Sequence, residues 1–298
     1  MKKITLSILA AVLLLSSACA PPAAVTTAAE SAATTIAETT SLPAVTPPSD
    51  PVVRLSTTTS VNDSGLLPEL EPLFEKASGY ELEVIANGSG AAIKLGESGD
   101  ADVLLVHSKA AEETFVKDGF GLSRISFMHN YYIIAGPEND PARIAVAKTA
   151  ADAFKLIADS GSSFISRGDK SGTNAAELKI WALEGIEPAG DWYVSAGKGM
   201  GASLIMASEM QAYILTDKAT FLSMKANTGL TILLGESDDM KNVYSLIAVN
   251  PEKNKGVNAE GAQAFIDFML SPEAQAVIKN FGAAEYGEAL FAFDQPTD

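Results

Sequence analysis

Residues 166–173, with the sequence SRGDKSGT, combine the residue types that bind a small anion. Arg167 offers a rigid fork of N–H donors to an oxyanion. Glycines let backbone N–H groups approach a ligand closely, and the helical pattern that follows directs more N–H groups toward it. By itself the segment is equally consistent with an N-capped helix after a surface turn.

Three other turns between predicted strands and helices are also rich in hydroxyls and glycines. They are residues 57–60 (TTTS), 88–90 (GSG) and 197–201 (GKGMG). In α/β sheets, ligands bind beyond the carboxyl ends of the strands, which is where such turns meet. Each turn alone is adequately explained as a cap or a loop. Together they predict a small ligand surrounded by N–H and O–H donors.

The sequence argues against an enzyme. His107 and His129 are the only histidines, with no metal-ligand spacing between them, which disfavours a histidine metal site or a Ser-His-Asp triad. No P-loop is present. Residues 195–198 match the S-x-x-K of penicillin-recognising enzymes, but their partner motifs are missing. We therefore expect no catalytic residue, no cofactor and no bound metal cation.

The N-terminus has the features of a targeting signal. Lys2 and Lys3 precede an apolar run that ends near Cys19, the only cysteine. The resemblance is to a bacterial lipoprotein signal over 1–19, which implies lipidation at Cys19 and an extracytoplasmic, membrane-anchored or periplasmic location. A plain cleaved secretory signal is the alternative. Residues 20–50 are rich in Ala, Thr and Pro and predict a disordered tether.

The charge balance limits the partners. The formal net charge is -16, and it becomes -18 without Lys2 and Lys3. An acidic chain disfavours nucleic acid and anionic membrane surfaces as partners. It does not disfavour a small anion, because local dipoles and hydrogen bonds govern a buried site.

The remaining chain predicts an α/β fold with a mainly parallel sheet. Helix 174–183 should place Ala175, Leu178, Trp181 and Ala182 on one face. Residues 131–137 and 244–251 share an aromatic start, an apolar run and a proline. We interpret them as two chain crossings between lobes, with 51–135 and 249–298 forming lobe I and 136–248 forming lobe II. Two unrelated core strands remain the alternative.

Strands are expected at 52–56, 81–86, 101–106, 164–165, 213–215 and 230–234, and helices at 66–77, from 91, and at 202–210, 219–225, 262–270 and 272–281.

The order of these motifs resembles that of the tungstate-binding proteins of bacterial ABC importers. The resemblance spans residues 52–282 and also includes 216–220 (TDKAT) and 270–275 (LSPEAQ). It implies a type II periplasmic-binding-protein fold, in which two α/β lobes close on the ligand. It also implies an ABC permease as partner and a monomeric protein. The implied oxyanion contacts come from Thr58, Thr59, Ser60, Ser89, Arg167, Ser171, Thr173 and Gly201. Asp169 would repel an anion, and its charge favours instead a role in orienting Arg167.

Other anions remain open at this point. Phosphate-binding proteins carry a similar R-x-D-x-S-G-T segment. Phosphate keeps a proton near neutral pH and needs an acceptor carboxylate, for which Asp63 and Asp217 are the candidates, whereas tungstate, molybdate and sulfate need donors only. Molybdate and tungstate are nearly the same size, and only the resemblance favours tungstate. A surface adhesion or interaction lipoprotein is a more distant alternative.

Overall fold

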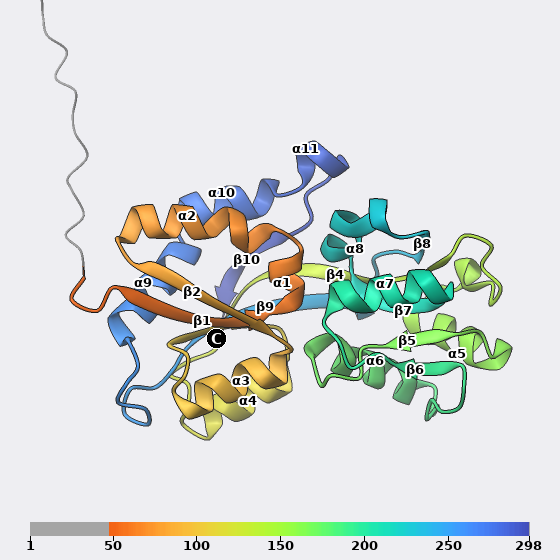
Figure 1. Cartoon of the computed structure of the whole chain (residues 1–298), viewed down its shortest axis with the longest axis horizontal. Helices are drawn as coiled ribbons and strands as arrows, with labels where there is room; N and C mark the ends of the chain where they lie inside the picture. The colour runs from red at the N-terminus through yellow and green to blue at the C-terminus, as the bar shows by residue number, and fades with distance from the viewer. Residues whose placement is uncertain (1–47, 298) are drawn as a thin grey trace, which may run out of the picture. The chain divides into compact units, whose positions relative to one another are not determined.

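The computed structural model describes residues 48–297 (Figure 1). The expected signal at 1–19, its Cys19, and residues 20–47 of the expected tether lie outside the described residues. Within the described part, no helix is both long and apolar enough to cross a membrane.

The strands form one hydrogen-bonded path in the order β2-β1-β3-β9-β4-β7-β5-β6, with β10 and β8 also paired to β4. We call β1, β2, β3, β9, β10 and the part of β4 through Tyr131 the first sheet, and β5 to β8 with the rest of β4 the second sheet. The strands are β1 (Val52–Thr58), β2 (Glu81–Asn87), β3 (Val103–Val106), β4 (Ile125–Pro137), β5 (Phe164–Ser166), β6 (Tyr193–Ser195), β7 (Tyr213–Asp217), β8 (Leu230–Leu234), β9 (Lys241–Ala248) and β10 (Ala292–Thr297).

Strand β4 carries the chain from one sheet to the other. Tyr131 pairs with Lys241 of the first sheet, and its neighbour Tyr132 pairs with Asp217 of the second. The chain returns between β8 and β9, because β9 pairs with β3 and β4. The expected boundaries are therefore displaced: the first lies after Tyr131 and not after 135, and β9 belongs to the first sheet although 136–248 was assigned to lobe II. An apolar run followed by proline indicates a buried strand, but it does not specify which strand pairs with it.

The α/β class is confirmed, but the sheet is mixed. Of the nine strand pairings described, four are parallel (β1 with β2 and β3, and β5 with β6 and β7). The other five all involve β4 or β9. These two strands run opposite to their neighbours because they connect the sheets, and the alternation of strands and helices predicts only the parallel parts.

Helices cover both faces of the first sheet. Alternate residues of β3 point in opposite directions: Val103 and Leu105 pack with α2, α9 and α10, whereas Leu104 and Val106 pack with α3 and α4. Figure 1 shows these two helical layers on either side of β1 and β2. The helices of this half are α1 (Thr59–Asp63), α2 (Leu66–Ser78), α3 (Ser89–Ser98), α4 (Lys109–Lys117), α9 (Ala259–Met269), α10 (Pro272–Asn280) and α11 (Ala283–Tyr286).

The second sheet is covered in the same way. Ile134 of β4 packs with α5 and α6, and Ile133 packs with α7 and α8. Its helices are α5 (Ala150–Ser160), α6 (Gly172–Leu183), α7 (Met200–Met210) and α8 (Lys218–Met224), with short 3-10 turns at η1 (Ile144–Val146), η2 (Lys225–Asn227) and η3 (Asp238–Met240). Each half thus has its own apolar core, which makes the strand ends between them available for a site.

The predicted face of α6 is wrong in part. Trp181 is buried, but Leu178 is 49% exposed and Ala175 and Ala182 are also exposed. The helix buries Glu177 together with Ile180, because the Glu177 carboxylate accepts hydrogen bonds from β5, from β6 and from Trp181 of its own helix. Hydrophobicity alone assigns such a glutamate to the surface.

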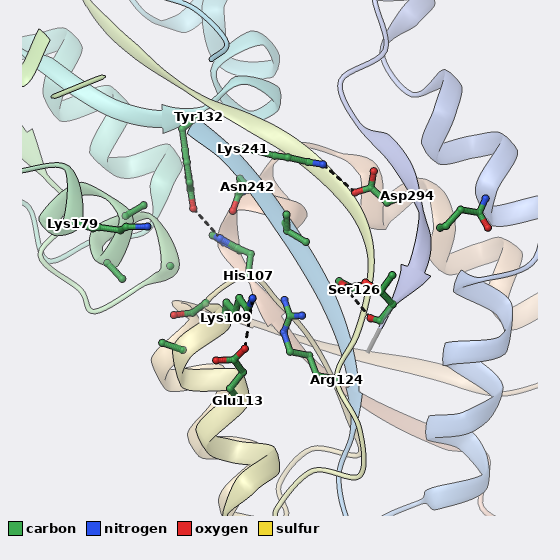
Figure 2. Close-up of a pocket in the computed structure, with 18 residues that line it drawn as sticks. His107, Lys109, Glu113, Arg124, Ser126, Tyr132, Lys179, Lys241, Asn242 and Asp294 are labelled. Carbon is green, nitrogen blue, oxygen red and sulfur yellow. Dashed lines mark hydrogen bonds and ion pairs between the residues drawn. The ribbon is translucent and has the colours of Figure 1, made fainter. Parts of the chain in front are cut away.

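A cavity of about 830 Å³ lies between α4 and α6 and is bounded by β4, β9 and β10 (Figure 2). Its basic side chains are largely matched by acids: Lys109 lies 3.7 Å from Glu113, and Lys241 lies 3.6 Å from Asp294. His107 and Tyr132 also line it. The predicted anion-binding turns lie elsewhere, apart from the first residue of α6.

Candidate functional site

The turn after β1 presents buried hydroxyls. Thr58 is the N-cap residue of α1, yet its side chain makes no capping hydrogen bond. Its Oγ1 instead lies 3.1 Å from Oγ of Ser60, and both residues are at most 1% exposed. The next residue, Thr59, accepts a hydrogen bond at 3.2 Å from Nη2 of Arg167, which belongs to the second half of the molecule. The turn therefore contacts the second half directly.

The second turn lies against the 166–173 segment. Ser89 begins α3 after the N-cap Gly88, is fully buried, and its hydroxyl has no partner among the described residues. A Cβ atom on Gly88 would lie 3.3 Å from Cβ of Ser171 and 3.4 Å from Oδ2 of Asp169. Glycine at this position allows the close approach of the two turns.

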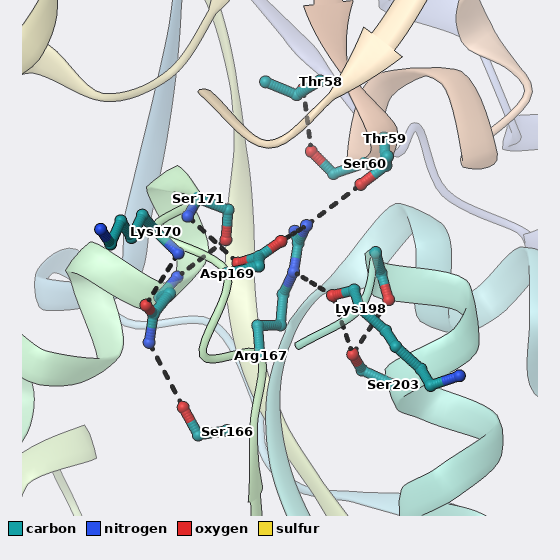
Figure 3. A network of polar contacts seen from close by, with 12 residues as sticks. Thr58, Thr59, Ser60, Ser166, Arg167, Asp169, Lys170, Ser171, Lys198 and Ser203 are labelled. Atoms are coloured by element: carbon teal, nitrogen blue, oxygen red, sulfur yellow. Dashed lines mark hydrogen bonds and ion pairs between the residues drawn. The ribbon is translucent and has the colours of Figure 1, made fainter. Parts of the chain in front are cut away.

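Arg167 is the centre of the polar network in Figure 3. It is only 2% exposed, and its Nη2 donates to Oδ2 of Asp169 at 2.5 Å. Its Nε donates to the carbonyl oxygen of Lys198 at 3.4 Å. The other Asp169 oxygen accepts from the backbone N–H of Ser171 at 3.1 Å. Asp169 therefore makes the contacts that an arginine-orienting role requires.

The start of α6 supplies two more hydroxyls. Ser171 is the N-cap, and its Oγ accepts from the backbone N–H of Asn174 at 3.2 Å, which leaves its O–H proton to donate elsewhere. Thr173 is 1% exposed, and its Oγ1 has no partner in the described part of the chain. A buried hydroxyl without a partner costs about 1–3 kcal/mol, so two of them, on Ser89 and Thr173, indicate a place where a ligand supplies the missing acceptor.

Gly201 is the predicted contact that the structure does not bring into this network. It lies in the first turn of α7, where an added Cβ would meet Met224 at 3.1 Å and Asp63 at 3.5 Å. The preceding N-cap, Gly199, lies closer to the site, since its Cβ would meet Thr59 at 3.3 Å. The glycine-rich sequence 197–201 did not indicate which of its glycines faces the ligand.

The two candidate acceptor carboxylates differ. Asp63 ends α1 and is exposed, so it is not buried in the site. Asp217 is fully buried and caps α8, with Oδ1 accepting from the backbone N–H of Thr220 at 2.8 Å. Its Oδ2 has no partner among the described residues, and burial raises the pKa of Asp217 to about 6.

Sequence reasoning missed His107 as part of the site. Its Nε2 lies 3.1 Å from Oγ of Ser60, its Nδ1 lies 3.1 Å from the hydroxyl of Tyr132, and its ring packs on Gly172 at the start of α6. Burial, with a smaller effect from the Arg167 charge, lowers the pKa of His107 to about 3, so the ring is neutral. The signal available in the sequence was its position directly after a buried strand, the same position that the predicted turns occupy.

Glu177 is the second residue that was missed. It is 2% exposed, and its carboxylate accepts from Ser166 at 2.7 Å, from Tyr193 at 2.6 Å and from Trp181 at 3.1 Å. Burial raises its pKa, while these donors lower it. The contacts join β5, β6 and α6, and Arg167 follows β5 directly, so Glu177 supports the loop that holds the arginine.

The groups that meet here suit an anion. The buried Arg167 contacts Thr59 at the start of α1, and Gly88 before α3 lies against Ser171 before α6. The hydroxyls of Ser89 and Thr173 have no partner among the described residues. Within the described residues, no group of three or more His, Cys, Asp or Glu side chains gathers to hold a metal ion. Two α/β halves with an anion site between their strand ends define the class of two-lobed solute-binding proteins.

The similarities to known proteins agree with this class. A family model described as "PBP superfamily domain" matches residues 27–273. The tungstate-binding protein TupA of Peptoclostridium acidaminophilum is 51% identical over 239 residues, which cover 80% of this chain and 84% of that protein. The TupA protein of Campylobacter jejuni is 40% identical, covering 80% and 89% respectively. The chain belongs to the PBP superfamily and, within it, to the family of the TupA tungstate-binding proteins.

A solved structure supports the same family membership. The crystal structure of the tungstate ABC transporter from Geobacter sulfurreducens is 49% identical with a TM-score of 0.72, covering 77% of this chain and 98% of that one. These relatives are binding proteins of transporters, and we expect no enzymatic activity of this chain.

Proposed function

We propose that this protein captures tungstate and delivers it to an ABC importer. The observation that carries the proposal is the buried Arg167 together with the hydroxyls of Ser89 and Thr173, which have no partner among the described residues. A fully deprotonated tetrahedral oxyanion offers an acceptor to each of these donors. The family membership supports tungstate as the ion, since relatives that bear its name are up to 51% identical to this chain.

The available donors are sufficient for tight binding. A hydrogen bond to a charged group contributes about 1.5–3 kcal/mol net. Six to eight such bonds, shared among hydroxyls, Arg167 and helix-start N–H groups, offset the dehydration of the ion and give about -8 to -12 kcal/mol, which corresponds to micromolar to nanomolar affinity. We propose Thr58, Thr59, Ser60, Ser89, Arg167, Ser171 and Thr173 as the contacts, and we retain Gly201 as the least supported of the set.

Calorimetry on residues 20–298 tests the proposal. The protein is titrated with tungstate, molybdate, sulfate and phosphate under the same conditions. We expect tungstate to bind most tightly and phosphate to bind weakly or not at all. Tight phosphate binding without tungstate binding would overturn the assignment, and binding of none of the four would favour a surface interaction protein.

Phosphate is the alternative that one observation favours. The unpartnered Oδ2 of the buried Asp217 is an acceptor of the kind that monoprotonated phosphate requires. If the protein binds phosphate, Asp217→Asn abolishes that binding, because an amide nitrogen replaces one of the acceptor oxygens. If it binds tungstate, the same variant leaves the affinity unchanged or improved.

We further propose that lipidated Cys19 anchors a monomeric protein outside the cytoplasmic membrane. This rests on the sequence of residues 1–19 and on the family's role in ABC import. A Cys19→Ser variant of the full chain, expressed in a bacterium with lipoprotein processing and labelled with a fatty acid, is expected to lose the label and leave the membrane fraction. A label that persists in the variant would exclude Cys19 as the anchor.

A further inference from the structure

We propose that His107 fixes the hydroxyl of Ser60 as a hydrogen-bond donor to the bound anion and thereby selects fully deprotonated oxyanions over monoprotonated ones. The inference rests on the proposed function. It assigns a positioning role to His107 and, through it, to Tyr132. Neither residue is among the proposed ligand contacts.

The proton count around the imidazole ring supports this arrangement. A neutral imidazole has one N–H donor and one acceptor nitrogen. Its Nδ1 lies 3.1 Å from the hydroxyl of the buried Tyr132. Burial raises the pKa of Tyr132, whereas Thr173 also acts on this hydroxyl and lowers that pKa, as a donor to the phenol oxygen does, so Nδ1 is the acceptor left for the phenol proton. The phenol therefore donates to Nδ1, and the imidazole proton must be on Nε2.

The position of the imidazole proton determines how the Ser60 hydroxyl can bind an anion. Nε2–H donates to Oγ of Ser60 over 3.1 Å and occupies one of its lone pairs. The Ser60 proton is then directed away from His107, toward Thr58, Tyr244 or an anion. The opposite tautomer would take up the Ser60 proton at Nε2 and leave the Tyr132 proton without an acceptor. Ser60 would then face the anion with lone pairs only.

Asn242 is the residue that competes with this arrangement. It lines the same cavity beside the ring, and its effect is to raise the pKa of His107, as an acceptor for Nδ1–H would do. Its amide nitrogen donates to Asn130 at 2.8 Å and to Tyr244 at 3.1 Å, so its oxygen is the atom that could accept from the ring. Among the described contacts, however, no hydrogen bond joins this oxygen to the ring, and the partner of Nδ1 is the Tyr132 hydroxyl at 3.1 Å. The Tyr132 phenol thus has the better claim on Nδ1.

The His107 ring also lies between residues of the two halves. The ring contacts Ser60 of the first half and Gly172 of the second, and Tyr132 is the first β4 residue paired in the second sheet. Figure 2 shows the side chains of His107 and Tyr132 pointing toward one another. Ser60 is therefore held in its donor state when the two halves are in contact.

Nitrogen-15 NMR of histidine-labelled protein tests the tautomer directly. The protein has two histidines, and a His129→Gln variant identifies the signals of His107. We expect a protonated Nε2 and an unprotonated Nδ1 at pH 7, with and without tungstate. A protonated Nδ1 in the tungstate-bound protein overturns the inference.

Two pairs of variants test the effect on the anion. His107→Gln keeps an N–H donor near the position of Nε2 and should bind tungstate within a few-fold of wild type. His107→Asn keeps only the contact near Nδ1 and should bind tungstate about 10- to 100-fold more weakly, with a smaller preference for tungstate over phosphate. Tyr132→Phe should reduce the same preference, whereas Tyr131→Phe, one residue away, should not.

These outcomes separate the two proposals. Equal losses in His107→Gln and His107→Asn, or an unchanged preference in Tyr132→Phe, indicate a purely structural role and overturn the inference. A wild-type protein that binds no tungstate overturns the proposed function and the anion selection together. In that case the NMR result still decides whether His107 orients Ser60.

Discussion

At the scale of single residues, the site combines one buried charge with hydroxyls that have no partner of their own. Arg167 is held from two sides, by Asp169 at 2.5 Å and by the carbonyl of Lys198 at 3.4 Å. These contacts occupy Nη2 and Nε, and the remaining nitrogen, Nη1, has no partner among the described contacts. A braced guanidinium loses little conformational entropy on binding, which favours affinity.

The first prediction concerns the arginine itself. Arg167→Ala removes the only arginine of the site and should weaken tungstate binding at least tenfold, about 1.4 kcal/mol, as measured by calorimetry. Lys198→Ala is the matched control, because it removes an exposed positive charge nearby while the backbone carbonyl that braces Arg167 remains. An unchanged affinity in Arg167→Ala would remove this residue from the site.

The second prediction concerns Thr173, whose buried Oγ1 lacks a partner. Thr173→Val keeps the shape and removes the hydroxyl. The ligand-free protein should become more stable by about 1 kcal/mol, because an unsatisfied polar group is lost, while tungstate binding weakens about tenfold. Urea unfolding and calorimetry measure the two effects. Two changes of opposite sign distinguish a ligand contact from a structural hydroxyl, for which stability and binding would fall together.

At the scale of the elements, the site depends on the ends of strands and the starts of helices. Ser60, Ser89 and Thr173 lie in the first turns of α1, α3 and α6, and Arg167 follows β5. Glycines let these turns approach one another across the two halves, as Gly88 does toward Ser171. The buried Glu177 keeps α6 joined to β5 and β6, so the arginine loop and the helix start have fixed relative positions.

The third prediction tests this close approach. A Cβ on Gly172 would lie 2.7–2.9 Å from Nδ1, Cε1 and the backbone oxygen of His107. Gly172→Ala should therefore prevent the two halves from meeting as described, and tungstate binding should weaken at least tenfold although alanine favours the helix. Gly235→Ala, where an added Cβ meets nothing within 4 Å, should bind as wild type does. Tight binding by Gly172→Ala would show that this contact is not required.

At the scale of the whole molecule, two sheets that share β4 each have their own core, and two buried ionisable groups, His107 and Asp217, lie close to the residues that join the halves. This arrangement makes stability depend on pH in two opposite ways. In the unfolded chain, His107 gains a proton below its ordinary pKa of 6.5, whereas in the folded protein it does so only near pH 3. The free energy of unfolding therefore falls as the pH is lowered from 6.5 to about 3. Asp217 acts in the opposite direction, since its pKa is raised from 3.8 to about 6, and stability rises as the pH falls between these values.

The fourth prediction separates the two effects. Asp217→Asn keeps an oxygen acceptor that caps α8 and removes the buried charge. We expect it to be more stable than wild type at pH 8, by about 1–3 kcal/mol, and to lose this advantage as the pH falls toward 4. Urea unfolding over a pH series measures the difference, with the exposed Asp63→Asn as the control for the loss of one charge. A constant difference from pH 8 to pH 4 would show that Asp217 does not titrate in this way.

The sequence was sufficient for the local parts of the site. Turns with hydroxyls and glycines between apolar runs indicated where strands end and helices begin, and these signals depend only on neighbouring residues. The predicted turns at 57–60, 88–90 and 166–173 all lie in the network around Arg167. The fourth predicted turn, 197–201, also lies against this network, but the glycine that contacts it is Gly199 and not Gly201.

Tertiary structure decided which distant residues complete the site and which strands join the halves. His107 contacts Ser60, Tyr132 and Gly172, and Glu177 is buried because three elements donate to it. The placement of β9 beside β3 and β4 was equally absent from the local pattern. An isolated histidine or glutamate has no spacing that identifies its partners. Those of His107 lie 25 and 47 residues away, and those of Glu177 on β5 and β6 lie 11 and 16 residues away. Burial and hydrogen bonding over such separations are properties of the folded chain.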